Sequence, residues 1–514
     1  MVTVSSHVER PMKIAMLSWE SLHSIRVGGI APHVTELAMT LHRRGHDVHI
    51  FTRRGEGQKR YERIDGVHYH RCPFEPHADF VTSMARMSDS FVWHLGEVEH
   101  GYGEPFDIIH GHDWLVGNGL VRIKNESHRP TVLTIHSTEY GRCGNELFWH
   151  GQSQQIRSIE WESTYVADRV ICVSESLRQE VQWLYSVPPD KSRAIYNGVD
   201  VARFDADVDV PSIRRAHAIR RHDPCVLFAG RMAWQKGPDL LVEAMSGVLK
   251  RHPDTKFVFA GEGDMRAELE GRVVAKGTAS ATRFLGYRTG TELVGLFKSA
   301  DVVCVPSRNE PFGIVILEAW SASKPVVATR TGGPAEFVRD EDTGLTVAGT
   351  VDSIGQGIES MLSDEVAARR MGVNGRREAE TRFSWDTIAA QTEAVYHSIV
   401  GTDGVATVQA ITGAMPKEVT MARKQEDQFG EGIDASARTT VSAPSCVPDR
   451  TERGALQRVA GGPIQPAADE IRRRAYEIYL ARNGAPGDPA SDWLHAEREL
   501  REGRATTAAR RPKR

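Results

Sequence analysis

The sequence has no long apolar run. No stretch of about 18 apolar residues, the length that spans a bilayer, occurs among its 514 residues. The first 12 residues also lack the apolar core of a signal peptide. We therefore expect no transmembrane segment and a cytoplasmic location.

Cysteine is scarce. The chain has six cysteines, and their positions are scattered without any Cys-x-x-Cys pair. Such spacing excludes a disulfide framework and a zinc site built on thiolates, and it fits a reducing compartment.

An excess of basic charge is also absent, because 64 Lys and Arg residues stand against 68 Asp and Glu residues. With a net charge of −4, no strong basic field exists to attract a nucleic-acid backbone, so we expect no nucleic-acid partner. The hydrophobic content of 40% is that of a soluble globular chain, and the length allows two to three domains.

Short apolar runs alternate with helical patterns over residues 12–200, which we interpret as the first domain. A strand at 13–17 leads into a loop with Gly28 and Gly29, and a helix follows from about Ala31. Two adjacent glycines let a backbone approach a ligand closely. Further strands are expected at 47–52, 66–70, 106–110, 131–136 and 169–173. The alternation predicts an α/β fold with a doubly wound parallel sheet.

Several histidines follow these strands, at the sheet edge where ligands bind in such folds. His136 is a candidate active-site residue. For His112 and Asp113, loop hydrogen bonding and helix capping explain the residues equally well. The run His110 to Asp113 could suggest a metal site, but neighbouring side chains alternate in direction and no spaced third ligand is evident. We therefore expect no metal.

The domain boundary is predicted at 201–222, where an acidic stretch precedes a basic one. Asp205 and Asp207 are interpreted as solvated charge rather than metal ligands. A second alternating domain is predicted at 223–385, and a helix at 386–400 is expected to cross back to the first domain. The strands of the second domain are expected at 225–229, 256–260, 282–285, 301–305 and 325–329.

Four glycine-containing loops are expected at one edge of this second sheet, namely 230–237, 261–264, 306–313 and 331–336. The first of these holds Arg231 and Lys236, two cations that can neutralise a diphosphate as it leaves. The third opens a helix at Gly313, and such an N-terminus favours an anion.

Two carboxylates accompany that helix, Glu310 in the loop and Glu318 early in the helix. Carboxylates accept hydrogen bonds from hydroxyls, which sugars and riboses supply. Taken alone, the pair could be a solvated acid and a helix-stabilising glutamate. Together with the cationic loop, it favours a site for a nucleotide sugar.

Beyond residue 400 the composition changes. We predict a disordered linker at 401–463, a small helical domain at 464–503 and a basic tail at 504–514. The helical stretch resembles a small bacterial domain of unknown function.

Five motifs in order resemble the retaining, nucleotide-sugar-dependent glycosyltransferases of the glycogen synthase and sucrose synthase superfamily, over roughly residues 12–400. The resemblance is nearest to the bacterial and archaeal glycogen synthase-like branch, although Arg26 stands where many of these synthases have lysine. It implies a GT-B fold, in which two Rossmann-like domains face each other across a cleft. The motifs lie at 27–29, 110–114, 134–136, 230–237 and 310–318.

The resemblance also implies roles for the candidate residues. Arg231 and Lys236 hold the diphosphate, Glu310 contacts the donor sugar, and Glu318 binds the ribose. His136 lies beside the donor sugar, so the implied catalytic set is His136, Arg231, Lys236 and Glu310. Backbone groups complete the donor site at Gly28, Gly29, Gly230, Phe312, Gly313, Gly332 and Gly333, while His112 and Asp113 lie on the acceptor side.

The expected function is transfer of a hexosyl unit, glucosyl favoured, from ADP- or UDP-glucose to a glycan or other hydroxyl acceptor, with no metal or other cofactor. The alternatives are a mannosyl- or other hexosyltransferase of envelope polysaccharide or glycolipid synthesis, a sugar-nucleotide epimerase or a glycan phosphorylase. A non-enzymatic nucleotide-sugar-binding module is a further alternative. The oligomeric state cannot be deduced from the sequence.

Overall fold

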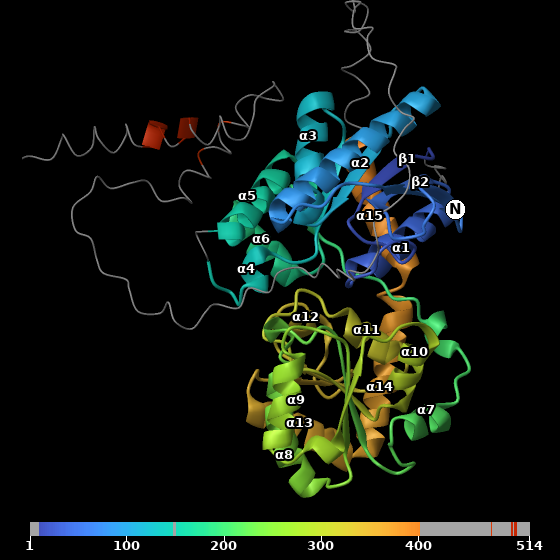
Figure 1. Ribbon diagram of the computed structural model, residues 1–514, viewed down its shortest axis with the longest axis vertical. Coiled ribbons are helices and arrows are strands. Elements are labelled where there is room, and N and C mark those ends of the chain that lie inside the picture. Colours follow the sequence, from blue (N-terminus) through green and yellow to red (C-terminus); the bar gives the residue numbers. More distant parts are fainter. Residues whose placement is uncertain are drawn as a thin grey trace, which may run out of the picture.

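The computed structural model describes residues 10–147 and 151–400, together with seven helical residues between 474 and 500. Figure 1 shows two α/β domains, the first in blue to green above the second in green to orange. The predicted linker, the basic tail and most of the small helical domain lie outside the described residues.

The first domain is built on an eight-stranded sheet with the strand order β3-β4-β2-β1-β5-β6-β7-β8. Neighbouring strands are parallel except β3, which runs antiparallel to β4 after a turn in which Asp65 and Gly66 both have positive φ. The predicted parallel sheet is confirmed, but β3 and β8 were not predicted. The strands are β1 (Lys13–Leu17), β2 (Asp47–Arg53), β3 (Tyr61–Ile64), β4 (Val67–Cys72), β5 (Ile108–His112), β6 (Thr131–Ile135), β7 (Arg169–Cys172) and β8 (Ser192–Ala194).

Helices cover both faces of this sheet (Figure 1). α1 buries an apolar stripe that includes Val34, Leu37 and Leu41, and the Ser174 side chain caps α6. The helical elements are α1 (Ile30–Arg43), α2 (Phe80–Tyr102), η1 (Trp114–Val116), α3 (Gly117–Ser127), α4 (Glu139–Arg142), α5 (Gly151–Val166) and α6 (Glu175–Tyr185).

The second domain has a six-stranded parallel sheet with the order β11-β10-β9-β12-β13-β14. All four residues of β12 are buried, as expected for a strand covered on both faces. The strands are β9 (Cys225–Ala229), β10 (Lys256–Ala260), β11 (Thr282–Gly286), β12 (Val302–Val305), β13 (Val326–Thr329) and β14 (Leu345–Val347), of which β14 was not predicted.

Nine α-helices follow η2 (Ala202–Asp205) within residues 206–400, and two short η turns lie between them. They are α7 (Val210–Ala216), η3 (Trp234–Lys236), α8 (Pro238–Arg251), α9 (Arg266–Ala275), η4 (Ala279–Ala281), α10 (Gly290–Ser299), α11 (Ile314–Ser321), α12 (Pro334–Phe337), α13 (Val351–Ser363), α14 (Glu365–Thr381) and α15 (Trp385–Val400). Within the predicted hinge, α7 packs on α10, and Arg214 donates to the Ser299 carbonyl at 2.6 Å.

The last helix, α15, returns to the first domain, as predicted. Trp385, Ile388 and Tyr396 belong to the same buried cluster as Val34 and Leu37 of α1. Where the chain crosses between domains, the Val199 N–H donates to the Phe383 carbonyl at 2.9 Å. Two chain segments therefore connect the domains side by side. Among the described residues, no helix is both long and apolar enough to cross a membrane.

Candidate active site

Glycines interlock three of the predicted loops at the carboxyl edge of the second sheet. Gly237 has φ 64°, and a Cβ there would lie 2.1 Å from the Pro306 carbonyl oxygen. Gly332 has φ 57°, and a Cβ there would lie 2.1 Å from the Glu310 carbonyl oxygen. That oxygen also accepts a hydrogen bond from the Gly333 N–H at 2.9 Å. Only glycine fits at Gly237 and Gly332, so the loops 230–237, 306–313 and 331–336 form one unit.

Lys236 and Glu310 form an ion pair within this unit. The Lys236 Nζ lies 2.9 and 2.8 Å from the two Glu310 carboxylate oxygens, and the Ser307 hydroxyl donates to the same carboxylate at 2.9 Å. Glu310 is buried. The structure thus brings together the two residues that the sequence assigned to the diphosphate and the donor sugar.

The side chains of Arg231 and Glu318 have no hydrogen-bond or ion-pair partner among the described residues. The Arg231 side chain is exposed to water within a cleft walled by protein, and the desolvation there lowers its pKa. Burial raises the pKa of Glu318 to about 7, and the charge of Arg203 opposes that shift. A charged group without a partner in a partly desolvated site is a place where a ligand gains most from binding.

In the first domain, Glu20 holds the predicted glycine loop. Its carboxylate accepts from the N–H groups of Val27 at 2.5 Å and Gly28 at 2.7 Å. A Cβ on Gly29 would lie 3.1 Å from Ile314 at the start of α11, so this loop reaches the second domain. Sequence reasoning missed Glu20, because a single glutamate after a strand carries no signal of its contacts with backbone N–H groups.

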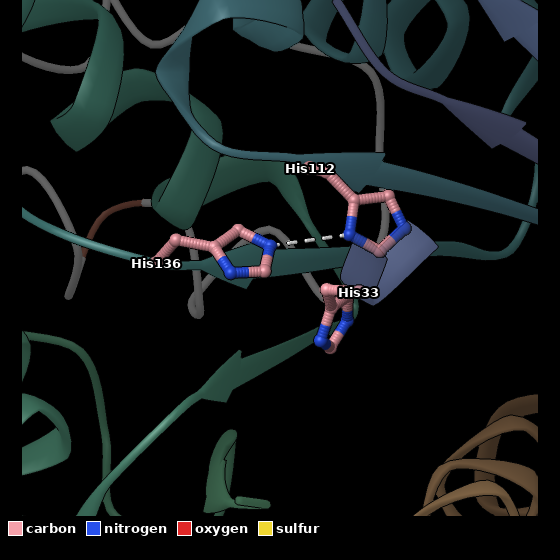
Figure 2. Close-up of side chains that lie close together, drawn as sticks. All are labelled: His33, His112 and His136. Atoms are coloured by element: carbon pink, nitrogen blue, oxygen red, sulfur yellow. Dashed lines mark hydrogen bonds between the residues drawn. The ribbon is translucent and has the colours of Figure 1, made fainter. Parts of the chain in front are cut away.

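Three histidines gather at the edge of the first sheet, as Figure 2 shows. The Nδ1 of His112 lies 3.4 Å from the Nε2 of His136, and the His33 ring centroid lies 4.6 Å from that of His136. Burial lowers the pKa of all three, that of His33 to about 4, so the imidazoles are neutral at pH 7.

His33 was not predicted. It lies one turn after Gly29 in α1, and its Nδ1 pairs with the Asn197 side-chain oxygen at 2.7 Å. The sequence had argued against a metal because no third ligand was evident. His33 is a possible third ligand, since one ring nitrogen from each of the three histidines lies within 4.8 Å of the others.

His110 and Asp113 have structural contacts. The prediction that His110 ends a strand is wrong, because His110 lies buried inside β5. Its ring nitrogens form hydrogen bonds with the Tyr396 and Thr134 hydroxyls at 2.7 Å each. Asp113 caps η1 by accepting from the Trp114 N–H at 2.8 Å, which is the capping alternative. An acceptor-side role for Asp113 stays a prediction.

The two domains touch across the cleft. The Glu336 carboxylate in α12 accepts from the N–H groups of Glu175 and Ser176 and from the Tyr196 hydroxyl, at 3.0, 2.5 and 3.1 Å. The Asn309 side chain donates to that of Asn145 at 2.6 Å.

A cavity of about 320 Å³ lies between the domains. A single residue at its border, Glu310, belongs to the predicted catalytic set, so the cavity adjoins the donor loops. The first domain contributes Asn145, Ser176, Leu177 and Glu180, and the second contributes Arg308, Asn309, Glu310, Pro311, Thr331 and Gly332.

Two doubly wound domains, with the charged glycine loops of one facing a histidine-bearing edge of the other, have the architecture of a GT-B glycosyltransferase. The chain belongs to the family described as Glycosyl transferases group 1, which it matches over residues 209–378, and residues 27–203 match Glycosyltransferase Family 4. Residues 468–502 match a family of unknown function, DUF2934, in agreement with the resemblance inferred for the helical stretch.

This chain matches several known proteins over nearly their full length. An uncharacterized glycosyltransferase of Methanocaldococcus jannaschii is 39% identical over 389 residues, covering 75% of this chain and 98% of that protein. A glycogen synthase of Mycobacterium tuberculosis is 30% identical over 400 residues, covering 75% and 94%. A D-inositol 3-phosphate glycosyltransferase of Saccharomonospora viridis is 30% identical over 401 residues, covering 73% and 91%.

Among solved structures, sucrose-phosphate synthase from Thermosynechococcus elongatus is similar with a TM-score of 0.65 and 25% identity, covering 76% of this chain and 99% of that one. These similarities identify the chain as an enzyme, a glycosyltransferase that moves a hexosyl unit and is glycogen synthase-like.

Proposed function

We propose that this enzyme transfers a glucosyl unit from ADP- or UDP-glucose to a glycan hydroxyl, with retention at the anomeric carbon and without a catalytic metal. The observation that carries the proposal is the Lys236–Glu310 pair beside the unpartnered Arg231. It offers fixed positive charge for a diphosphate and a carboxylate for sugar hydroxyls at one place.

The charges suit the bond changes of this transfer. The bond from the anomeric carbon to the phosphate oxygen breaks, and negative charge develops on the diphosphate, where Arg231 and Lys236 stabilise it. The acceptor oxygen bonds to the anomeric carbon on the same face, and its proton passes to the departing phosphate oxygen. No covalent nucleophile is needed for this front-face route.

The neutral His136 is proposed to hydrogen-bond the donor sugar, and His112 to orient His136. Their nitrogens lie 3.4 Å apart, while the Nδ1 of His33 is already engaged by Asn197. Dialysis against a chelator, with measurement of bound metal, tests the metal-free reading. We expect unchanged turnover; activity that is lost and then restored by a divalent ion would overturn it.

The similarity to a glycogen synthase favours glucose as the transferred sugar and a glucan as the acceptor. A second candidate acceptor is a small polyol phosphate, which the D-inositol 3-phosphate glycosyltransferase relative favours. The cytoplasm is the proposed compartment, since Cys72, Cys172, Cys225 and Cys304 are buried free thiols.

The test is release of nucleoside diphosphate from a panel of ADP-, UDP- and GDP-sugars, with and without maltooligosaccharide. We expect glucan-dependent release from ADP- or UDP-glucose that is lost in Glu310→Ala and Lys236→Ala. Lys276→Ala is the control, because its ammonium pairs with Glu243 at 2.5 Å on the surface. Glucan-independent preference for GDP-mannose would discard the glucan acceptor, and tight binding without any release would favour a binding module.

A further inference from the structure

The outer end of helix α6 carries an exposed tryptophan, Trp183, which contacts the partly buried Tyr140 of α4. Trp183 is 60% exposed, although a tryptophan side chain gains strongly from burial. The Tyr140 ring of α4 lies against it in a T-shaped arrangement, with 5.4 Å between ring centroids and an interplanar angle of 71°. The contact holds the Trp183 indole in place and leaves much of its surface to solvent.

This pair continues one wall of the cleft. Ser176 and Glu180 of α6 line the cavity, and Trp183 follows at the next helical position on the same face. Thr138 precedes α4 as its N-cap residue, and its hydroxyl donates to the Glu180 carboxylate at 2.5 Å. The cavity wall and the aromatic pair are therefore parts of one connected surface on α4 and α6.

We propose that Trp183 and Tyr140 form a stacking subsite for an extended oligosaccharide acceptor, a linear chain of hexose units whose reactive end lies in the cleft. The C–H face of a hexose ring is apolar and carries partial positive charge, so it packs on the negative face of an aromatic ring. A chain that leaves the cavity along α6 passes this pair. A single small polyol phosphate is too short to fill the cavity and reach the aromatic pair as well, so the subsite favours a glycan acceptor.

This inference rests on the proposed function, in that the cleft binds an acceptor, but binding without donor can be measured separately. The full chain is run in native gels that contain glycogen, and its retardation gives the affinity. For Trp183→Ala we expect about tenfold weaker retention, the loss of one good aromatic contact. Trp183→Phe, which keeps a stacking face, should recover most of the retention.

A matched control is Trp93→Ala. Trp93 is 61% exposed on α2, and it too has a T-shaped neighbour, the His94 ring at 4.7 Å. We expect this variant to be retained like the wild type. If both tryptophan variants lose retention equally, or if neither does, the stacking subsite is wrong.

Turnover gives an independent readout. With ADP- or UDP-glucose, the loss of kcat/KM in Trp183→Ala should grow as the acceptor lengthens from maltose to maltoheptaose. A loss that is the same for every acceptor length would overturn the subsite while leaving the glucan transferase in place. Wild-type retention by glycogen without any glucan-dependent turnover would instead overturn the proposed reaction.

Discussion

The two edges that face each other across the cleft are built on opposite principles. On the first domain, neutral imidazoles pack against one another, and His33 and His110 already have hydrogen-bond partners. On the second domain, glycine loops hold charged groups, of which Arg231 and Glu318 have no partner among the described residues. The Nε2 atoms of His33 and His112 lie buried without a hydrogen-bond partner. The comparison teaches that one edge presents uncharged ring nitrogens to a ligand, whereas the other presents charged groups.

The largest effect should come from the charged edge. Lys236→Ala removes a fixed cation from the leaving group and strands the buried Glu310, so we expect kcat/KM to fall about 10²- to 10³-fold. Steady-state rates with ADP- or UDP-glucose and a glucan measure this. A fall no larger than that of the surface control Lys276→Ala would contradict the contrast between the edges.

His136→Ala tests the neutral edge. It deletes one uncharged hydrogen bond, so the expected loss in kcat is about tenfold. Burial holds the pKa of His136 well below 6.5, and the ring is therefore uncharged throughout the neutral range. The wild-type pH–rate profile should lack a His136 limb near pH 6.5; a limb there that vanishes in the variant would show that this edge is charged after all.

Glu318→Gln separates ligand binding from stability. Because the folded-state pKa is raised from 4.5 to about 7, this carboxyl favours folding at low pH, and that contribution is lost as the pH rises through about 7. Without nucleotide, the variant should therefore be more stable than the wild type at pH 8, by on the order of 1 kcal/mol, and the difference should shrink towards pH 5.

Thermal unfolding with and without ADP or UDP provides the measurement for Glu318. The nucleotide should raise the Tm of the wild type more than that of the variant, which lacks an ionised acceptor for ribose. The exposed Glu365 pairs with Arg369 on α14, and Glu365→Gln should change neither quantity. Equal nucleotide stabilisation of both proteins would remove Glu318 from the site.

Glu336→Ala should have the smallest effect, since it leaves Arg231, Lys236 and Glu310 in place and removes only a contact between the domains. Loss of its hydrogen bonds to the start of α6 should cost about 1 kcal/mol of stability. We also expect a higher KM for the donor, because the walls are held together less firmly. A KM that stays at the wild-type value would mean that the contact does not support the closed cleft.

The sequence predicts the alternation of strands and helices well, because buried parallel strands such as β12 are continuous apolar runs between glycine turns. It fails at β3, β8 and β14. These strands are only three or four residues long, and none of the three contains two apolar residues in a row. Their pairing is decided by neighbouring strands rather than by their own composition.

The candidate site shows the same division. Lys236 and Glu310 are predictable because a cation and a carboxylate in strand-end loops meet at one sheet edge. His33 and Glu20 are not, since one lies inside an ordinary helical pattern and the other binds backbone N–H groups. Only tertiary packing tells which side chains of α1 reach the histidines of β5 and β6.

Because α15 returns to the first domain, we expect the usual order in which domains fold during synthesis to be reversed. The first domain lacks part of its core until Trp385 to Ile399 have been made, because these residues pack among Val34, Leu37 and Leu41. The second domain is continuous over 210–381 and can fold earlier on the ribosome, although it is translated later than the first. A chain that stops at residue 384 should leave residues 10–200 open to protease while the second domain resists, and resistance of both would refute this order.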